Sequence, residues 1–373
     1  MEWKFKYYDV DLGVNWDALK QSCEWFVEME AIPQDHIWHA EGNVQIHTTM
    51  VTEALMGLEE FQALSDQDKH IMVTSALMHD IEKRSTTIHN FRDGRQCISA
   101  PKHANRGEFT SRTLLYKEFG APFNIREKVA KLVRYHGIPL WKEEEDLTKT
   151  VIESSLYLNN ELLCMLSKAD VLGRTCNDQE NLLEKIEYFR LVAMDEMVYN
   201  TPCQFASNLH RFNYLGKNKP MEYVPFDEDK FEVFMMSGVA GSGKDTYIKN
   251  NLNHLPMVSL DDIRVEMGVK PTDKKGNGRV YQEAKERCKI LMRNHNSFVF
   301  NATNTITDTR SRWTRLFETY GGKTNIVYVE VPYQTLLTQN KSREDAVPDK
   351  IIEKMIKNLE MPTYDEAVDI ILA

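Results

Sequence analysis

The sequence predicts a multidomain chain of two fold classes, an all-α helical bundle followed by an α/β domain with a parallel sheet. Over residues 1–204, apolar side chains recur at helical spacing, as at Val51 and Leu55, and most glycines and prolines fall between such runs. From Phe231 onward, short apolar runs alternate with longer amphipathic stretches. Strands that alternate with helices are typical of a parallel sheet covered on both faces.

Residues 205–230 separate these two patterns. This stretch loses the apolar periodicity and contains Gly216, Pro220 and Pro225, which favour turns and loops. We therefore expect a first domain over residues 1–204, a linker over 205–230 and a second domain over 231–373.

Composition excludes several classes of protein. No apolar run approaches the roughly 18 residues of a membrane span, and the N-terminus lacks the apolar core of a signal peptide. The six cysteines are scattered, which is typical of a reducing compartment. We therefore expect a cytoplasmic protein with no membrane partner. The net charge of −10 lies almost wholly in the first 230 residues, so a polyanion would meet the C-terminal half more easily.

A phosphate-binding loop follows the first predicted strand of the α/β region. Phe231–Met236 has the pattern of a buried strand, GVAGSGK follows over 238–244, and an amphipathic helix comes next. In this context the glycines of a P-loop let backbone N–H groups cradle phosphate oxygens, which predicts ATP as phosphate donor with Mg²⁺. The residues expected to bind it are Gly238, Gly241, Ser242, Gly243, Lys244, Asp245 and Thr246, with Lys244 also acting in catalysis through its charge.

Polar side chains follow two further predicted strands, at the edge where a parallel sheet collects ligands. Asp261 and Arg264 follow one strand, and Thr303 and Asn304 follow the next. A carboxylate there can accept the proton of an attacking hydroxyl, and an arginine one turn later can hold a phosphate. Helix capping is the alternative for the carboxylate. Farther on, Arg343 lies in a basic segment that we expect to close over the donor phosphates as a lid.

This order of motifs resembles the kinase domain of phage-type 5′-OH polynucleotide kinases over nearly all of the second domain. The resemblance implies that Asp261 is the general base on the 5′-hydroxyl and that Arg264 holds the phosphate beside the acceptor. It also implies that Thr303 and Asn304 line the acceptor site, and that Arg343 is the lid arginine that binds the donor and acts in catalysis.

Three positions depart from the pattern of such kinases. Asp245 follows the P-loop lysine, where a serine or threonine hydroxyl normally holds Mg²⁺. A carboxylate is also a hard oxygen ligand, so Asp245 and Thr246 are alternative ligands for the metal. Ala302 stands where the phage pattern carries an aspartate, and Gln339 stands where it carries an arginine.

The first domain carries an ordered set of candidate metal ligands. His79 and Asp80 lie on an apolar helix, and adjacent helical residues can converge on one ion inside a bundle. A single histidine on an apolar face is more often a hydrogen-bonded core residue, so the doublet requires partners. The set on separate predicted helices is His47, His79, Asp80, His103, His136 and Asp170. These donors suit one or two divalent ions that activate water and neutralise a phosphoryl oxygen.

This ordered set resembles the HD phosphohydrolase superfamily over residues 42–174. The resemblance implies one metal held by His47, His79, Asp80 and Asp170, and a second held by His103 and His136 with Asp80 as the bridge. The metals expected are Mn, Co, Ni, Zn or Mg. Lys83 and Arg174 each lie one turn beyond a ligand, so they can act in catalysis by reaching a substrate phosphate, with a solvated face as the alternative. For His36 and His39, a surface loop is favoured over contact with substrate or metal.

The two domains together resemble bacterial fusions of an HD phosphatase with a polynucleotide kinase. The resemblance implies an end-healing enzyme that removes a 2′- or 3′-phosphate, or opens a 2′,3′-cyclic one, and phosphorylates a 5′-hydroxyl. Its partners would be RNA or DNA ends and a nucleic-acid ligase acting downstream. One alternative is an HD nucleotidase fused to a kinase for nucleosides or other small molecules. Another is a non-catalytic nucleic-acid-binding module.

Overall fold

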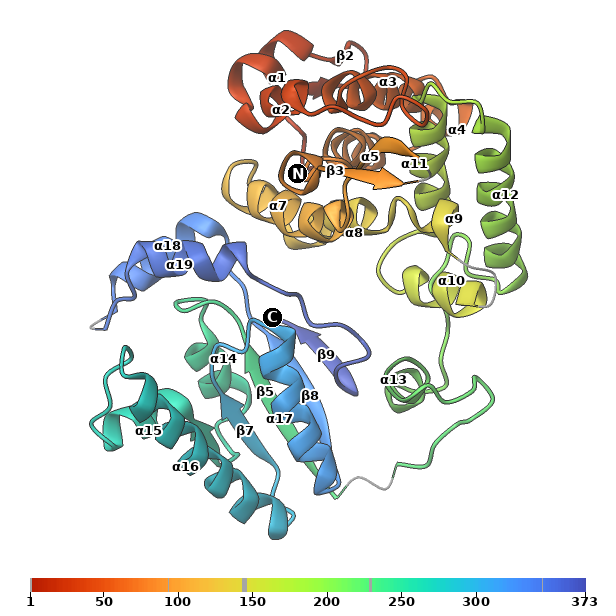
Figure 1. Ribbon diagram of the computed structural model, residues 1–373. Helices are drawn as coiled ribbons and strands as arrows, with labels where there is room; N and C mark the ends of the chain where they lie inside the picture. The colour runs from red at the N-terminus through yellow and green to blue at the C-terminus, as the bar shows by residue number, and fades with distance from the viewer. Residues whose placement is uncertain (1, 93, 143–145, 228–229, 344) are drawn as a thin grey trace. The chain divides into compact units, whose positions relative to one another are not determined.

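The computed structural model describes residues 2–92, 94–142, 146–227, 230–343 and 345–373. The chain forms two compact units, residues 1–203 and residues 204–373. The first unit is mostly helical and the second is an α/β unit (Figure 1). Within the described ranges, no helix is both long enough and apolar enough to cross a membrane.

Helices build most of the first unit. They are α1 (Trp16–Ser22), α2 (Glu24–Glu28), α3 (Val44–Met56), α4 (Glu59–Gln62), α5 (Asp66–Met78), α6 (Lys83–Thr86), α7 (His103–Lys117), α8 (Phe123–Tyr135), α9 (Ile138–Trp141), α10 (Leu147–Ser155), α11 (Asn160–Leu172) and α12 (Gln179–Asp195), with a short 3₁₀ turn at Met29–Ala31. Asn43 and Ser65 begin α3 and α5, because their side chains accept hydrogen bonds from N–H groups of the first turn. Residues 70–78 of α5 are all buried, and α3, α8 and α11 pack against this central helix.

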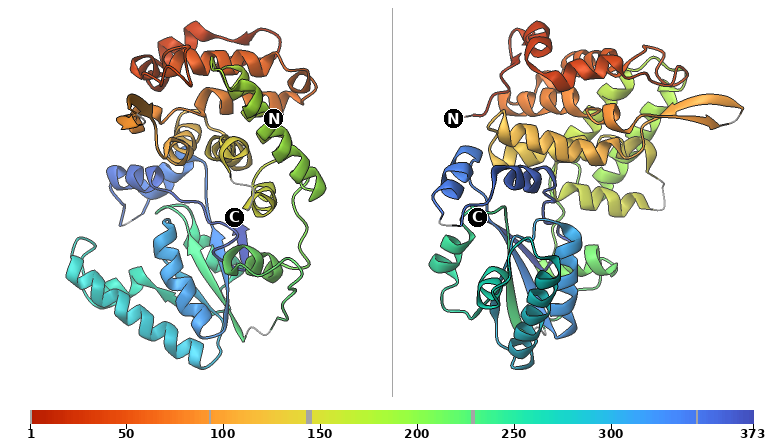
Figure 2. Two further views of the ribbon diagram at one scale, coloured as in Figure 1. Left: turned by 45° about the vertical axis from the view of Figure 1, so that its right-hand side comes forward. Right: turned by 60° about the vertical axis from the view of Figure 1, so that its left-hand side comes forward.

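Two antiparallel hairpins depart from the expected all-α class. They pair β1 (Tyr8–Asp9) with β2 (Gly13–Val14), and β3 (Ile88–Arg92) with β4 (Arg95–Ser99). The β3–β4 hairpin extends from the helices in the right-hand view of Figure 2. Its strands do not strictly alternate apolar with polar residues, so the sequence pattern does not mark them.

Asp35 fixes the β3–β4 hairpin to the loop that precedes α3. The Asp35 carboxylate oxygens accept hydrogen bonds from Arg95 Nη1 at 3.1 and 2.8 Å, and one of them accepts from the Ile98 N–H at 3.1 Å. Burial opposes ionisation of Asp35, but the bonds from Arg95 and Ile98 lower its pKa below the ordinary value. One buried carboxylate thus joins two segments that are distant in sequence.

A five-stranded parallel sheet forms the second unit, which confirms the predicted α/β class. Its strands are β5 (Phe231–Ser237), β6 (Met257–Ser259), β7 (Phe298–Asn301), β8 (Gly322–Tyr328) and β9 (Asp369–Leu372), in the order β6-β7-β5-β8-β9. Four of these strands follow the apolar runs of the sequence. β9 was not expected, because it has only four residues and follows a stretch without periodicity.

Helices cover both faces of this sheet (Figure 1). The helices of this unit are α13 (Asn208–Lys217), α14 (Lys244–Asn251), α15 (Leu260–Glu266), α16 (Lys274–Arg293), α17 (Thr307–Thr319), α18 (Tyr333–Lys341) and α19 (Asp349–Lys357). Successive strand residues point to opposite faces. Met235 and Phe298 therefore pack with Trp313 of α17 in one core, while Met236 packs with Ile248 of α14 in the other.

Helix α13 occupies part of the stretch that was expected to be a linker. Phe212 of α13 is buried, and Arg211 donates a hydrogen bond to the Val368 carbonyl at 3.2 Å. Gly216 allows the helix to approach the Asp365 carbonyl oxygen, which would lie 2.5 Å from an added Cβ. The helix therefore belongs to the second unit. Its short length, and the glycine in its last turn, explain why the sequence pattern favoured a loop.

Candidate metal centre and P-loop site

Six side chains from different helices of the first unit meet around one point. They are His47 of α3, His79 and Asp80 directly after α5, His103 at the start of α7, His136 directly after α8 and Asp170 of α11. Their ligand atoms form two groups, and within each group all atoms lie within 4.8 Å of one another: His47, His79 and Asp170, and Asp80, His103 and His136. All are buried except His103, which is partly exposed. The structure thus brings together every member of the ligand set expected from the sequence.

Asp80 lies between the two groups. Its Oδ2 is 3.2 Å from His79 Nε2 and 3.6 Å from His47 Nε2. Its Oδ1 is 3.3 Å from His103 Nε2 and 4.0 Å from His136 Nε2. The two oxygens of one carboxylate therefore face different pairs of imidazoles, as a bridge between two ions requires.

The second nitrogen of each imidazole is held by an acceptor. For three of them, Nδ1 lies close to the carbonyl oxygen of the residue three positions earlier. These pairs are His79 with Ala76 at 2.7 Å, His103 with Ala100 at 2.7 Å and His136 with Val133 at 2.8 Å. Because a carbonyl only accepts, Nδ1 carries the proton and Nε2 keeps the lone pair that a metal requires.

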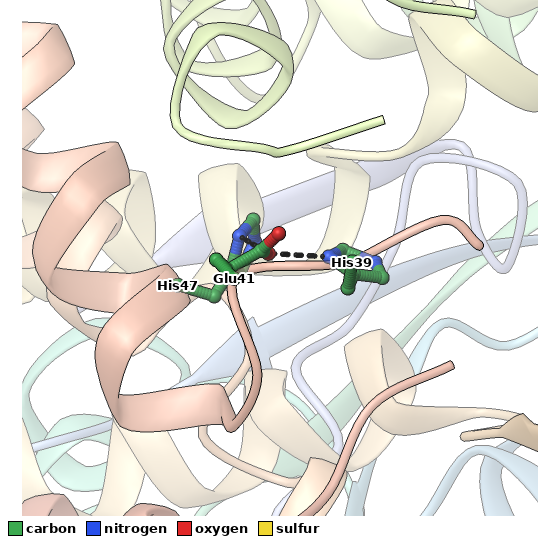
Figure 3. A group of neighbouring side chains, drawn as sticks. All are labelled: His39, Glu41 and His47. Carbon is green, nitrogen blue, oxygen red and sulfur yellow. Dashed lines mark hydrogen bonds and ion pairs between the residues drawn. The ribbon is translucent and has the colours of Figure 1, made fainter. Parts of the chain in front are cut away.

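Glu41 is the corresponding acceptor for His47. Its Oε1 lies 2.9 Å from His47 Nδ1 and 2.8 Å from His39 Nδ1, so the carboxylate stands between the two rings (Figure 3). Its Oε2 accepts a hydrogen bond from the Thr175 N–H at 2.9 Å. The surface-loop interpretation therefore fits His36, which is exposed, but not His39, whose side chain is only 11% exposed. Sequence reasoning missed Glu41, because a supporting carboxylate has no characteristic spacing.

Burial and neighbouring cations set the charges of the cluster. Burial opposes ionisation of Asp80 and Asp170, but Lys83 and Arg174, respectively, help to hold their pKa values well below the ordinary range. Burial also lowers the pKa of His136 to about 3. At neutral pH the cluster therefore offers two carboxylates and a neutral His136.

Lys83 and Arg174 contact the carboxylates directly. Lys83 Nζ lies 2.7 Å from Asp80 Oδ2, and Arg174 Nη2 donates to both oxygens of Asp170 at 2.9 and 2.8 Å. Their side chains are 13% and 8% exposed, so neither lies on a solvated face. Both cations stand where an anion bound at the cluster would meet them.

The donor set fits divalent metal ions. The Nε2 atoms of His47 and His79 are buried and face carboxylates of the same cluster, Asp170 Oδ1 at 3.1 Å and Asp80 Oδ2 at 3.2 Å. Four imidazoles and two carboxylates are the ligands that Mn, Co, Ni and Zn take in proteins. If bound, such ions would supply Lewis acidity and lower the pKa of a coordinated water.

The P-loop connects β5 to α14. Gly238, Gly241 and Gly243 have φ values of 150°, 84° and 97°, which other residues rarely adopt. A Cβ at Gly238 would also lie 2.5 Å from the Val329 carbonyl oxygen. The glycines therefore permit the tight loop at the N-terminus of α14, where an anion is stabilised.

A cavity of about 530 Å³ lies over this loop. Its lining is Gly241, Gly243, Lys244, Asp245, Thr246, Gln339, Arg343 and Asp345. Lys244 Nζ donates to the carbonyls of Gly238 and Val239 at 3.0 Å each, and burial lowers the pKa of Lys244 to about 8. Ser242, which was expected to bind the donor, is buried within the loop.

Asp245 has a fixed partner on the neighbouring strand. Its Oδ1 accepts a hydrogen bond from Asn301 Nδ2 at 2.9 Å, and Asn301 is the last residue of β7. Both Asp245 and Thr246 line the cavity, so the two alternatives for a magnesium ligand remain open. The sequence did not assign a role to Asn301.

Asp261 lies in the first turn of α15 and forms an ion pair with Arg264. The cap of α15 is Ser259, whose Oγ accepts from the Asp262 N–H at 3.2 Å. Capping therefore does not occupy Asp261, and its side chain is 75% exposed. Arg264 Nε also donates to Asn277 Oδ1 at 2.9 Å, which orients the guanidinium.

Thr303 and Asn304 connect β7 to the P-loop. The Thr303 carbonyl accepts from the Gly238 N–H at 2.9 Å, and Asn304 Nδ2 donates to the Met236 carbonyl at 2.8 Å. Asn304 is only 2% exposed, whereas Thr303 is partly exposed. Lining an acceptor site requires an accessible side chain, so this geometry suits Thr303, while Asn304 fixes the strand ends.

Arg343 lies two residues beyond α18 and lines the P-loop cavity. Asn340 shapes this segment, because its side chain donates to the Val347 carbonyl at 2.7 Å and accepts from the Val347 N–H at 3.1 Å. Asn340 Cα lies 3.4 Å from the position of a Cβ on Gly241. The segment therefore passes directly over the loop, which is the placement that a lid requires.

Comparisons with known proteins concern the second unit. The profile of an AAA domain family matches residues 233–362. No curated protein matches the sequence. The geometry of the P-loop and the matched profile together identify the second unit as a P-loop domain, which implies the use of a nucleotide with Mg²⁺.

Three solved structures illustrate the similarity. A candidate kinase from Chloroflexus aurantiacus has a TM-score of 0.34 and 13% identity, over 39% of this chain and 86% of that chain. A sugar kinase from Janibacter has a TM-score of 0.30 and 17% identity, over 38% of this chain and 84% of that chain. A chain of the Pnkp1/Rnl/Hen1 complex has a TM-score of 0.29 and 16% identity, over 32% of this chain and 45% of that chain.

Proposed function

We propose that the chain is a bifunctional enzyme that heals nucleic-acid ends. The first unit, as an HD-type phosphohydrolase, removes a terminal 2′- or 3′-phosphate or opens a 2′,3′-cyclic phosphate with the help of divalent metals. The second unit transfers a phosphoryl group from ATP to a 5′-hydroxyl end. The observation that carries the proposal is the convergence of six metal-ligating side chains in a chain that also holds a P-loop.

In the first unit, the protein's own contribution is to hold metals and to orient the ester. The six candidate ligands would hold the ions, and Asp80 contacts imidazoles of both halves of the centre. Lys83 and Arg174 bind the phosphate, because both already lie against the carboxylates of the centre. From these positions the two cations would neutralise charge that develops on the phosphate oxygens.

In the second unit, catalysis depends on position and charge, because phosphoryl transfer leaves little covalent chemistry to the protein. Asp261 accepts the proton of the attacking 5′-hydroxyl, and Arg264 holds the phosphate beside it. Lys244 and Arg343 neutralise the group in transfer. Thr303 lies beside the acceptor.

One incubation tests both activities. An oligonucleotide with a 5′-hydroxyl and a 3′-phosphate is mixed with the protein, ATP and Mg²⁺ or Mn²⁺, in RNA and DNA forms, and both ends are analysed. We expect exchange at both ends, after which a nucleic-acid ligase seals the product. A nucleoside phosphorylated faster than the oligonucleotide would instead favour a small-molecule kinase, and retention of both original ends would overturn the proposal.

A further inference from the structure

A second cavity of about 530 Å³ opens beside the metal centre of the first unit. His103 and His39 line it on the side of the centre, together with Lys83 and Arg174. The β3–β4 hairpin supplies another wall through Ile98 and its neighbours. A cavity of this size is typical of sites for small ligands.

Two tryptophans give this cavity an aromatic lining. The sequence contains six tryptophans, and among the described residues only Trp38 and Trp141 are strongly exposed, at 47% and 62%. Both line this cavity, although one precedes α3 and the other ends α9. Exposed aromatic faces beside a charged groove are the platforms on which proteins stack nucleobases.

The charge of the lining suits an anion. The charged side chains of the lining, besides the histidines, are Lys83, Arg174, Lys185, Asp35 and Asp178. The lining thus holds three cations and two carboxylates; Asp35 is paired with Arg95, and Lys83 and Arg174 lie against Asp80 and Asp170 of the metal centre. Lys185 Nζ lies 5.4 Å from the centroid of the Trp141 ring, which places a positive charge next to an aromatic face.

We propose that this cavity binds the terminal nucleotide of a nucleic-acid end, with its base stacked against Trp38 and Trp141. Its phosphate then reaches Lys83, Arg174 and the metal centre, while Lys185 meets the next phosphate of the chain. The inference rests on the proposed phosphatase function and adds to it a binding site for the terminal base. The first unit thus contacts the terminal base of the nucleic acid as well as the terminal phosphate.

The first experiment compares two substrates that differ only in the terminal base. Phosphate release is measured on a 3′-phosphate oligonucleotide with an ordinary last residue and on one whose last residue is abasic. We expect kcat/KM to favour the ordinary substrate by roughly 5- to 100-fold, the range that stacking of one base provides. Trp38→Ala and Trp141→Ala should lower this ratio, and Trp141→Phe should keep most of it.

Phe91→Ala is the matched control. Phe91 is 73% exposed in β3 but does not line the cavity, so its removal should leave the ratio as in the wild type. A wild-type ratio near one, or a ratio that none of the tryptophan variants changes, would overturn the inference while phosphate release itself supports the proposed function.

A binding measurement separates the two claims when no phosphate is released. Nucleoside 3′-monophosphate and glycerol 2-phosphate are titrated into the full chain with Mg²⁺, and tryptophan fluorescence is recorded. Saturable quenching by the nucleotide alone, lost in Trp38→Ala and Trp141→Ala, supports the nucleotide pocket even where the phosphatase proposal fails. Equal quenching of tryptophan fluorescence by the two compounds would overturn the inference, whether or not the protein releases phosphate.

Discussion

In the candidate metal centre, the candidate ligands are almost all buried side chains, and each imidazole has its second nitrogen beside a carbonyl or Glu41. In the P-loop site, glycine backbone shapes the cavity, and the candidate base Asp261 is largely exposed and paired with Arg264. The first arrangement fixes its groups before a substrate arrives, whereas the second leaves a substrate to align them. Substitution of a candidate ligand should therefore abolish activity in the first unit, whereas substitutions of supporting groups there and of groups in the second unit should have graded effects.

The largest effect is expected at the bridge of the metal centre. Asp80→Ala should abolish phosphate release, because it removes the only side chain of the cluster that faces both imidazole pairs in the described structure. His79→Ala should have the same result. The kinase activity of the same preparations is the internal control and should persist. Phosphatase activity that survives both substitutions would place the hydrolytic site elsewhere.

The next effect is expected at Asp261. Asp261→Asn preserves size and removes the basic oxygen, so kinase turnover should fall by roughly 10²- to 10⁴-fold while ATP binding changes little. Asp262→Asn is the matched control, since Asp262 contributes its N–H to the cap made by Ser259. Steady-state kinetics of both variants show which of the two aspartates acts as the base. If Asp262 proved essential and Asp261 dispensable, the motif would be displaced by one residue.

A smaller effect is expected at the acceptor for His47. Glu41→Gln should weaken metal binding by about 10- to 100-fold, the usual consequence of losing a supporting carboxylate. Metal titrations monitored by thermal unfolding should shift to higher concentration, because metal stabilises only the state that binds it. Saturating metal should restore phosphatase activity. Glu59 lies at the exposed start of α4, so Glu59→Gln should leave the metal titration as it is in the wild type. An unshifted titration of Glu41→Gln would argue against a supporting role of Glu41 for His47.

The smallest effect is expected at the departure from the P-loop pattern. If the Asp245 carboxylate holds Mg²⁺, Asp245→Ala should raise the Mg²⁺ concentration needed for half-maximal kinase activity. If the Thr246 hydroxyl holds Mg²⁺, Thr246→Val should raise this Mg²⁺ concentration instead. Asn301→Ala distinguishes them further, because it frees only the Asp245 carboxylate. If the Mg²⁺ titrations of all three variants coincide with that of the wild type, neither Asp245 nor Thr246 is a ligand of the magnesium ion.

Helical spacing and motif order were sufficient to predict the parts of the molecule that repeat a pattern. His47 and Asp170 lie on the inward faces of α3 and α11, as apolar periodicity predicts, and His79 meets them directly after the buried end of α5. The P-loop glycines are likewise marked by spacing, since only glycine tolerates their backbone angles.

Features that depend on a single long-range contact have no pattern in the sequence and could not be predicted from it. Glu41 reaches His47 from a loop, and Asn301 reaches Asp245 from another strand. Helix α13 was assigned to a linker because its packing partners lie far along the chain, as Arg211 and Val368 show. Asn304 was expected beside the acceptor from motif order, but a motif does not reveal that its side chain is buried.

Asp35 has a consequence for the timing of turnover. It ties the hairpin that supplies Ile98 to the loop that carries Trp38, so one carboxylate holds two walls of the same cavity together. In the proposed nucleotide site, separation of these two walls would widen the exit for the product. We therefore expect the hydrogen bonds of Asp35 to Arg95 and Ile98 to govern the residence time of the product rather than the rate of bond cleavage.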